Sequence, residues 1–274
     1  MTRSAILLGL FVAVQIVASA AGRILGNIEP LLQGISLSEL PATPLSQGTA
    51  LLVGEALLCT ALIWAFRRES PTALLRTGER PATATVWKAT AGFVMAGWGV
   101  SLFFDPLTLP DGGTTAQFAA MRRSLVGPLL LCAVGPLTEE LVFRRGIIPA
   151  LCAKGHSPRT AVILSAAAFA LVHNNLAQAL PAFLLGLLLG RLFLRSRNLR
   201  LCLPAHIFYN AIAFTLLFRP HPEPTPEWLP LWASLTAGFL LTAAGIAVVV
   251  HLCSKPSSAP GQPPQGEHPA PPAA

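Results

Sequence analysis

Charged residues are scarce in this 274-residue chain, at 11% of the total, whereas soluble domains average about 25%. Hydrophobic residues make up 53%, and apolar runs close to twenty residues long recur along the sequence. A run of about 20 apolar residues can cross a bilayer as a helix. The shortage of charge therefore excludes an ordinary soluble domain. It predicts an all-α, polytopic transmembrane helix bundle of about eight spans, because the periodicity and the Gly and Ala content favour helices over a barrel.

Other absences narrow the chemistry. The five scattered cysteines include no Cys-x-x-Cys pair, so we interpret them as small buried hydrophobes and not as a disulfide or metal framework. No His-Glu-x-x-His is present, which excludes the usual arrangement of zincin metalloproteases. The sequence also lacks a Gly-x-Ser-x-Gly-like turn, which a serine protease would be expected to contain. An aspartyl intramembrane protease needs two aspartates in the membrane, but the only two, Asp105 and Asp111, lie in one loop.

The apolar segments predict eight spans at residues 1–21, 48–66, 84–104, 124–145, 159–174, 176–194, 201–218 and 228–252. Residues 147–158 are predicted to form a short interfacial segment. Ala18-Ser19-Ala20 resembles a signal-peptidase site, yet we favour an uncleaved first span because further spans follow. We expect one transmembrane helical domain over residues 1–255, with a functional core at about 124–218. Residues 256–274 are predicted to be a disordered Pro-rich tail.

The net charge of +7 does not indicate a nucleic-acid partner, because the basic residues gather at span ends. With both termini in the cytoplasm, 15 of the 19 lysines and arginines lie on the inner side of the eight spans. Cytoplasmic loops of membrane proteins carry such an excess. We therefore expect an integral, multi-pass protein of a bacterial inner membrane with both termini cytoplasmic.

A charged cluster interrupts the apolar pattern at Glu139, Glu140, Arg144 and Arg145. A charge at the bilayer centre costs about 2.5–3.5 kcal/mol on insertion scales, so such residues mark a candidate functional site. Glu140 and Arg144 are four residues apart and are predicted to pair, which leaves Glu139 as the freer carboxylate. Neighbouring side chains on an α-helix point about 100° apart. We therefore expect one glutamate to enter a central cavity while the other faces an adjacent helix.

Two further polar pairs lie inside apolar spans. Phe169-x-x-x-His173 closes the predicted fifth span, and His206-x-x-x-Asn210 lies in the seventh. Residues four apart share a helix face, and in lipid that face should point toward the other polar groups. An acid, two imidazoles and an amide supply what peptide hydrolysis by water needs. In this span scheme, however, Glu139 lies toward the inner end of its helix and His173 toward the outer end of its own.

Glu-Glu-x-x-x-Arg, Phe-x-x-x-His and His-x-x-x-Asn, in this order on separate spans, resemble the CPBP family. This family contains the CAAX prenyl proteases and the bacteriocin-processing or Abi-type intramembrane proteases. The resemblance runs from Glu139 to Asn210. It implies an eight-helix intramembrane bundle, proteolysis of a membrane-associated protein or peptide substrate, and no nucleic acid as partner.

The resemblance also implies roles for individual residues. Glu139 would be the catalytic glutamate and His173 its partner in activating water, whereas His206 and Asn210 would stabilise the oxyanion. Glu140 and Arg144 would support them. The family has been described both as metalloproteases and as glutamate-dependent proteases. The residues favour the second description and no cofactor, but two histidines and one glutamate could also hold a divalent metal.

Alternative functions fit the same residues. The charged cluster could be a structural ion pair in a non-catalytic bacteriocin-immunity or scaffolding protein. Glu139 and His173 could instead form the proton relay of a transporter. We interpret Glu55, a lone acid in the second span, as a packing partner or a minor polar contact to the cavity. Gly186-x-x-x-Gly190 is expected to serve helix packing. For a protease, the substrate could be a prenylated tail, a leader peptide or a C-terminal sorting anchor.

Overall fold

The computed structural model describes residues 3–40, 43–66, 81–122, 126–173, 175–216 and 230–254. Every regular element within these residues is a helix, and none is a β-strand, which confirms the predicted all-α class. The longer helices are α1 (Arg3–Leu25), α3 (Pro44–Phe66), α5 (Thr83–Phe104), α10 (Pro158–Leu171), α11 (Leu176–Ser196), α12 (Leu199–Leu216) and α13 (Leu231–Ser254). Shorter elements are α2 (Ile28–Leu32), η1 (Asp105–Leu107) and α6 (Thr114–Met121).

One further helix is built from five consecutive segments, and we call it the composite helix. Its parts are α7 (Val126–Leu129), η2 (Leu130–Val134), α8 (Gly135–Glu139), η3 (Glu140–Ile147) and α9 (Ile148–Ala153), of which η2 and η3 are π-helical. The composite helix continues to Ala153, so the prediction of a separate interfacial segment at residues 147–158 was wrong. With it, each of the eight predicted spans corresponds to a described helix.

Five described helical stretches are long and apolar enough to cross a membrane: Ile6–Leu25, Gly48–Phe66, Val126–Ala153, Leu176–Ser196 and Leu231–Ser254. Pro158–Leu171 is apolar but shorter. These helices make the chain an integral, multi-pass membrane protein. The predicted disordered tail, residues 256–274, lies outside the described residues.

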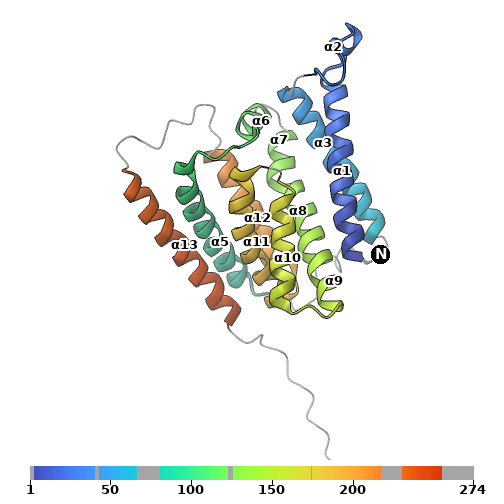
Figure 1. Ribbon diagram of the computed structural model, residues 1–274. Helices are drawn as coiled ribbons and strands as arrows, with labels where there is room; N and C mark the ends of the chain where they lie inside the picture. The colour runs from blue at the N-terminus through green and yellow to red at the C-terminus, as the bar shows by residue number, and fades with distance from the viewer. Residues whose placement is uncertain are drawn as a thin grey trace, which may run out of the picture.

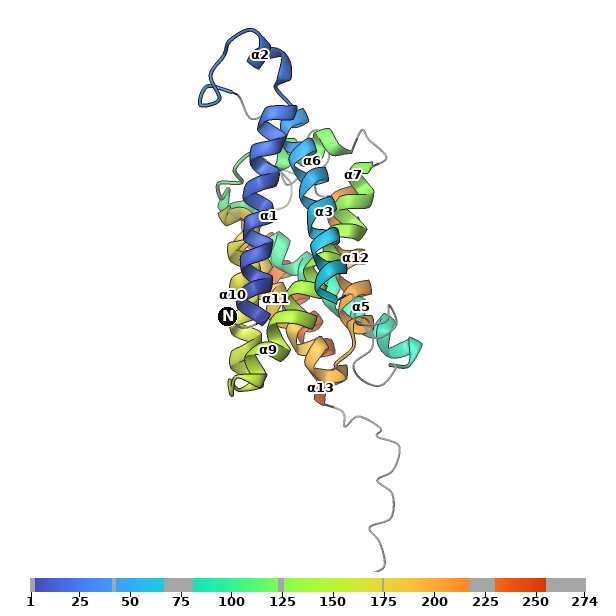
Figure 2. The ribbon, with the colours of Figure 1, turned by 90° about the vertical axis from the view of Figure 1, so that its right-hand side faces the viewer.

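The helices form a central group flanked by two pairs (Figures 1 and 2). α1 packs on α3 at one side, and α5 packs on α13 at the other. Between them stand α10, α11, α12 and the composite helix. The N-terminal end of α1 and the C-terminal end of α13 lie at the same end of the bundle, as an even number of crossings requires (Figure 1). The polar motifs all belong to the central group.

Glycine allows α5 and α13 to approach closely. Gly92 and Gly99 on α5 face Gly245 and Gly238 on α13, and an added Cβ at Gly99 or Gly245 would press on the partner's backbone. Small residues at such contacts are typical of membrane helices, where packing replaces the hydrophobic effect between helices. Gly186 and Gly190 likewise contact α10, at Ala166 and Val162, which confirms the predicted packing role of this pair.

Candidate active site

Two prolines shape the helix that carries the glutamates. Pro136 follows the π-helical segment η2, and Pro149 follows η3. Proline has no N–H to donate and clashes with the carbonyl four residues before it, so each position disturbs the regular hydrogen bonding of an α-helix. In membrane helices, local π turns are one way to satisfy the freed backbone groups. As a result, a wide helical turn begins at Glu140, directly after Glu139.

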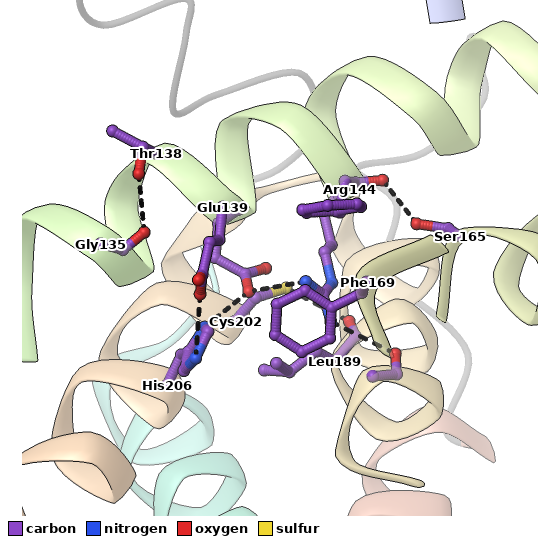
Figure 3. A network of polar contacts seen from close by, with 12 residues as sticks. Gly135, Thr138, Glu139, Arg144, Ser165, Phe169, Leu189, Cys202 and His206 are labelled. Carbon is purple, nitrogen blue, oxygen red and sulfur yellow. Dashed lines mark hydrogen bonds and ion pairs between the residues drawn. The ribbon is translucent and has the colours of Figure 1, made fainter. Parts of the chain in front are cut away.

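Both glutamates contact one imidazole from α12. His206 Nδ1 lies 2.9 Å from Glu140 Oε1, and His206 Nε2 lies 3.5 Å from Glu139 Oε2 (Figure 3). The two acids therefore reach the same ring, whereas the expected split between a central cavity and an adjacent helix stays a prediction. A π-helix closes hydrogen bonds over five residues instead of four, so a turn takes more residues and neighbouring side chains diverge by less than the ~100° of an α-helix. The wide turn lets consecutive acids reach the same ring.

Glu140 and Arg144 form the ion pair that their spacing predicts. Arg144 Nη1 lies 3.1 Å from Glu140 Oε1, and the two side chains are 1% and 0% exposed. The guanidinium also stands over the Phe169 ring, 4.5 Å from its centroid, and Nη2 approaches the Gly186 carbonyl at 3.5 Å. Glu139 is different, because 22% of its side chain is exposed. It is the freer carboxylate, as predicted.

Phe169 stands between the polar residues of three helices. Its ring makes edge contacts with the rings of His173, at 4.9 Å, and His206, at 5.9 Å. His173 Nδ1 lies 2.8 Å from the Phe169 carbonyl oxygen. A carbonyl can only accept, so Nδ1 carries the hydrogen and Nε2 of the neutral ring is left as an acceptor. The three motifs thus meet around one aromatic ring.

Glu139 and His173 do not lie toward opposite ends of the bundle, because His206 contacts Glu139 and the Phe169 ring contacts both His206 and His173. Because the composite helix extends from Val126 to Ala153, Glu139 lies near its middle, and His173 follows the end of α10. No hydrogen bond or ion pair joins Glu139 to His173 in the described part of the chain; the contact of Glu139 in this motif set is with His206. Their partnership in activating water stays a prediction.

Asn210 lies one turn beyond His206 and faces the same composite helix, as the spacing predicts. Its Nδ2 donates to the Leu131 carbonyl at 3.1 Å, within the wide turn η2. An amide nitrogen carries two hydrogens, so one remains for another acceptor. His206 and Asn210 therefore present donors along one helix face.

Glu55 and Thr138 are polar neighbours of the site whose contact the sequence did not reveal. Thr138 Oγ1 lies 3.1 Å from Glu55 Oε2 on α3 and 2.8 Å from the Gly135 carbonyl. Both side chains are buried, and Thr138 directly precedes Glu139. The only signal in the sequence was an acid within an apolar span, which does not identify its partner.

Asn175 ties the His173 turn to the start of α6, which follows the loop that contains Asp111. Its Oδ1 accepts from Gln178 N at 2.9 Å and caps α11, while its Nδ2 lies 3.0 Å from the His173 carbonyl and 3.3 Å from Thr114 Oγ1. Asp111 orders that loop, because its carboxylate accepts from the Gly113 and Thr115 amides. These bonds hold the pKa of Asp111 below its ordinary value. The turn after α10 is therefore braced from outside the motif set.

A structural or catalytic zinc site uses three or four protein ligands. Among the residues that the structure describes, no three histidine, cysteine, aspartate or glutamate side chains gather as ligands of one ion. The expectation of no cofactor stays a prediction.

Comparison with known proteins identifies relatives of this region. Residues 122–212 match the family model described as "Type II CAAX prenyl endopeptidase Rce1-like", and this stretch contains all three motifs. CAAX prenyl protease 2 of Arabidopsis thaliana is 33% identical over 153 residues, which cover 48% of this chain and 46% of the relative. The chain thus spans about half the length of that curated relative. No solved structure matches the chain. The matched stretch is therefore similar to the CAAX prenyl endopeptidases, in agreement with the resemblance that the motifs indicate.

Proposed function

We propose that this chain, whose core shares the motifs and sequence of the CPBP family, is an intramembrane endopeptidase that uses Glu139 to hydrolyse a peptide bond. The observation that carries the proposal is the contact of His206 with both Glu139 and Glu140, the second of which is paired with Arg144. Three elements far apart in sequence thus bring an acid, imidazoles and an amide to one place. A charge network of this kind inside a bundle is the arrangement expected of a reaction site in a membrane.

In the proposed reaction, the Glu139 carboxylate takes a proton from water as the water oxygen attacks the peptide carbonyl. His173 Nε2, whose lone pair is free, accepts a hydrogen bond from the same water. Charge then develops on the carbonyl oxygen, where the second amide hydrogen of Asn210 donates, and where His206 Nε2 donates once the ring carries a hydrogen on both nitrogens. Collapse of the tetrahedral intermediate breaks the C–N bond, and the proton held by Glu139 passes to the leaving amine.

Glu140 and Arg144 have a supporting part. Glu140 accepts from Nδ1–H of His206 and fixes the ring with Nε2 directed at the reacting groups. Arg144 balances the charge of the buried Glu140 by a direct ion pair. The roles match those implied by the motif resemblance, with one addition: in the resting site His206 contacts Glu139 directly.

Glu139→Gln tests the proposal, because the amide keeps the shape but cannot accept a proton. We expect the variant to insert and fold normally and to lose turnover. Peptide termini in the membrane proteome should be compared among cells that produce the wild-type chain, Glu139→Gln and the control Glu29→Gln, whose acid is exposed on α2. The proposal is supported by peptide termini that appear with the wild-type chain and with Glu29→Gln but are missing with Glu139→Gln. Wild-type termini with Glu139→Gln would reject it.

The substrate class is proposed from the relative's name, CAAX prenyl protease. We expect the purified chain in lipid to cleave a peptide that ends in a prenylated CAAX sequence faster than the same peptide without the lipid. Equal rates would assign the chain to unlipidated membrane peptides instead. Cleavage that survives a strong chelator is expected of a glutamate-dependent reaction, and loss that is restored by added zinc would overturn the glutamate-dependent assignment.

A further inference from the structure

Glu55 is a buried acid for which the proposed reaction has no use. It lies on α3 and is 7% exposed. Glu139 and Glu140 each contact a histidine or an arginine, but no arginine, lysine or histidine pairs with Glu55 within the described residues. An unpaired charge buried away from water costs several kcal/mol or more, and such groups usually avoid the cost by holding a proton. The surroundings of Glu55 thus differ in kind from those of the other two acids.

The hydrogen bonds of Thr138 point to the same state. Its hydroxyl has one hydrogen but lies within bonding distance of two oxygens, Gly135 O at 2.8 Å and Glu55 Oε2 at 3.1 Å. The carbonyl of Gly135 can only accept, so the shorter contact uses the hydroxyl hydrogen. The lone pairs of Thr138 Oγ1 then face Glu55. A carboxylate there would be repelled, whereas a carboxylic acid can donate.

We propose that Glu55 is a positioning residue that acts as an uncharged acid, donating to Thr138 and through it holding the last turn of α8, from which Glu139 projects. The role rests on the proposed peptidase function. The chain of donors runs from Glu55 to Thr138 to the Gly135 carbonyl, and it links α3 to the residue next to the catalytic carboxylate. Removing this link should let the Glu139 carboxylate leave its place beside His206.

The neutral state of Glu55 matters because of its titratable neighbours. Glu139 and Cys59 both lie within electrostatic reach of Glu55. A second negative charge beside Glu139 would repel the carboxylate that has to take a proton from water. An uncharged acid at the same position supplies a hydrogen bond without that repulsion. Glutamine has the same length and can donate in the same way, and leucine cannot.

This difference defines the kinetic test. We expect Glu55→Gln to keep kcat within a few-fold of wild type, and Glu55→Leu to lower kcat by about tenfold or more with little change in KM, because misplacement by about 1 Å can cost 10²-fold. Thr138→Ser should behave like Glu55→Gln, and Thr138→Val like Glu55→Leu. If Glu55→Leu does not fold, Thr138→Val still tests the proposal, because it removes the same hydrogen bond from the other side. Full activity in both Glu55→Leu and Thr138→Val would overturn the proposal, as would a Glu55→Gln variant as slow as Glu55→Leu.

An infrared measurement separates this inference from the peptidase function. The wild-type chain in lipid at neutral pH should show the C=O band of a protonated carboxylic acid, and the band should be lost in Glu55→Gln. Glu29→Gln, which removes an exposed acid, should leave it in place. If the chain is not a peptidase, neither the wild type nor any variant cleaves the peptide, but the C=O band is still present in the wild type and lost in Glu55→Gln. If Glu55→Gln leaves the band unchanged, Glu55 is ionised and the inference is wrong.

Discussion

Arg144 shows at the scale of one residue why the charged motif needs its particular side chains. Its guanidinium pairs with Glu140 and also stands over the Phe169 ring. A planar, delocalised cation can do both at once, whereas the compact ammonium of lysine cannot. Glu140 in turn is fully buried and binds His206. The position of His206 therefore depends on a cation that does not touch it.

Arg144→Leu should be strongly destabilising, because it leaves Glu140 buried beside His206 without its cation. Breaking a buried pair by removing one partner costs about 3–5 kcal/mol. Unfolding of the purified chain in mixed micelles, followed by circular dichroism, gives the measurement. Arg159→Leu is the matched control, since Arg159 is exposed at the start of α10 and surface changes usually stay within about 0.5 kcal/mol. Equal stability of the two variants would show that the Glu140–Arg144 pair contributes little.

Spacing along the sequence predicts some of these contacts and misses others. The pair Glu140–Arg144 and the edge contact of Phe169 with His173 both join residues four apart, and both are present. The approach of Glu139 and Glu140 to one imidazole was not predictable in this way. It depends on a wide turn in the backbone, and sequence periodicity assumes 3.6 residues per turn throughout.

At the scale of an element, the turn between α10 and α11 carries His173, and Asn175 holds it by two separate means. The side-chain oxygen caps α11, and the side-chain nitrogen bonds the His173 carbonyl and reaches α6. Substitution can separate these functions, because aspartate retains the capping oxygen and lacks the N–H donors. The cap and the bond to the His173 carbonyl are local, whereas the contact with Thr114 depends on how α6 packs and is not evident from the sequence.

Asn175→Ala should lower both stability and turnover, because it removes the cap and the brace together. Loss of a cap costs about 1 kcal/mol. Asn175→Asp should keep most of that stability and still reduce turnover, since His173 loses its brace. The two quantities should be measured on the same preparations, by thermal unfolding and by peptide cleavage. Full turnover in Asn175→Asp would show that the brace does not position His173.

The packing of α5 on α13 gives a second prediction for an element. Gly245→Leu would place a side chain against the α5 backbone at Ala96, where overpacking costs about 1–3 kcal/mol. Gly9→Leu is the control, because a Cβ at Gly9 meets nothing within 4 Å. We expect Gly245→Leu to unfold at a lower temperature than wild type and Gly9→Leu to match it. Equal midpoints for both variants would show that α13 is free to move away from α5.

At the scale of the whole molecule, the order of helices was predictable and their limits were less so. Runs of apolar residues are set by bilayer thickness, so all eight predicted segments correspond to helices. The end of the fourth segment was misplaced because Arg144 and Arg145 look like the charged edge of a span. In the structure Arg144 is buried with Glu140 instead, and the helix continues past it to Ala153.

The positive charge of the loops predicts the orientation of the bundle. The start of α1 and the end of α13 lie at the same end, and we expect that end to face the cytoplasm. A reporter that is active only in the cytoplasm should be active when fused after Ser254 and inactive when fused after Gly113, in the loop between α5 and α6. The opposite pair of results would reverse the orientation.

Under the proposed function, the position of Glu139 near the middle of the composite helix determines how far a substrate chain has to extend into the membrane. Thirteen residues separate Glu139 from Val126, which corresponds to roughly 20 Å at 1.5 Å per residue. Under the proposed function, a polypeptide that approaches from that rim has to extend about six residues inward before its scissile bond meets the carboxylate, at about 3.3 Å for each residue. The length of helix between Val126 and Glu139 would then set how far from the lipid headgroups a chain is cut.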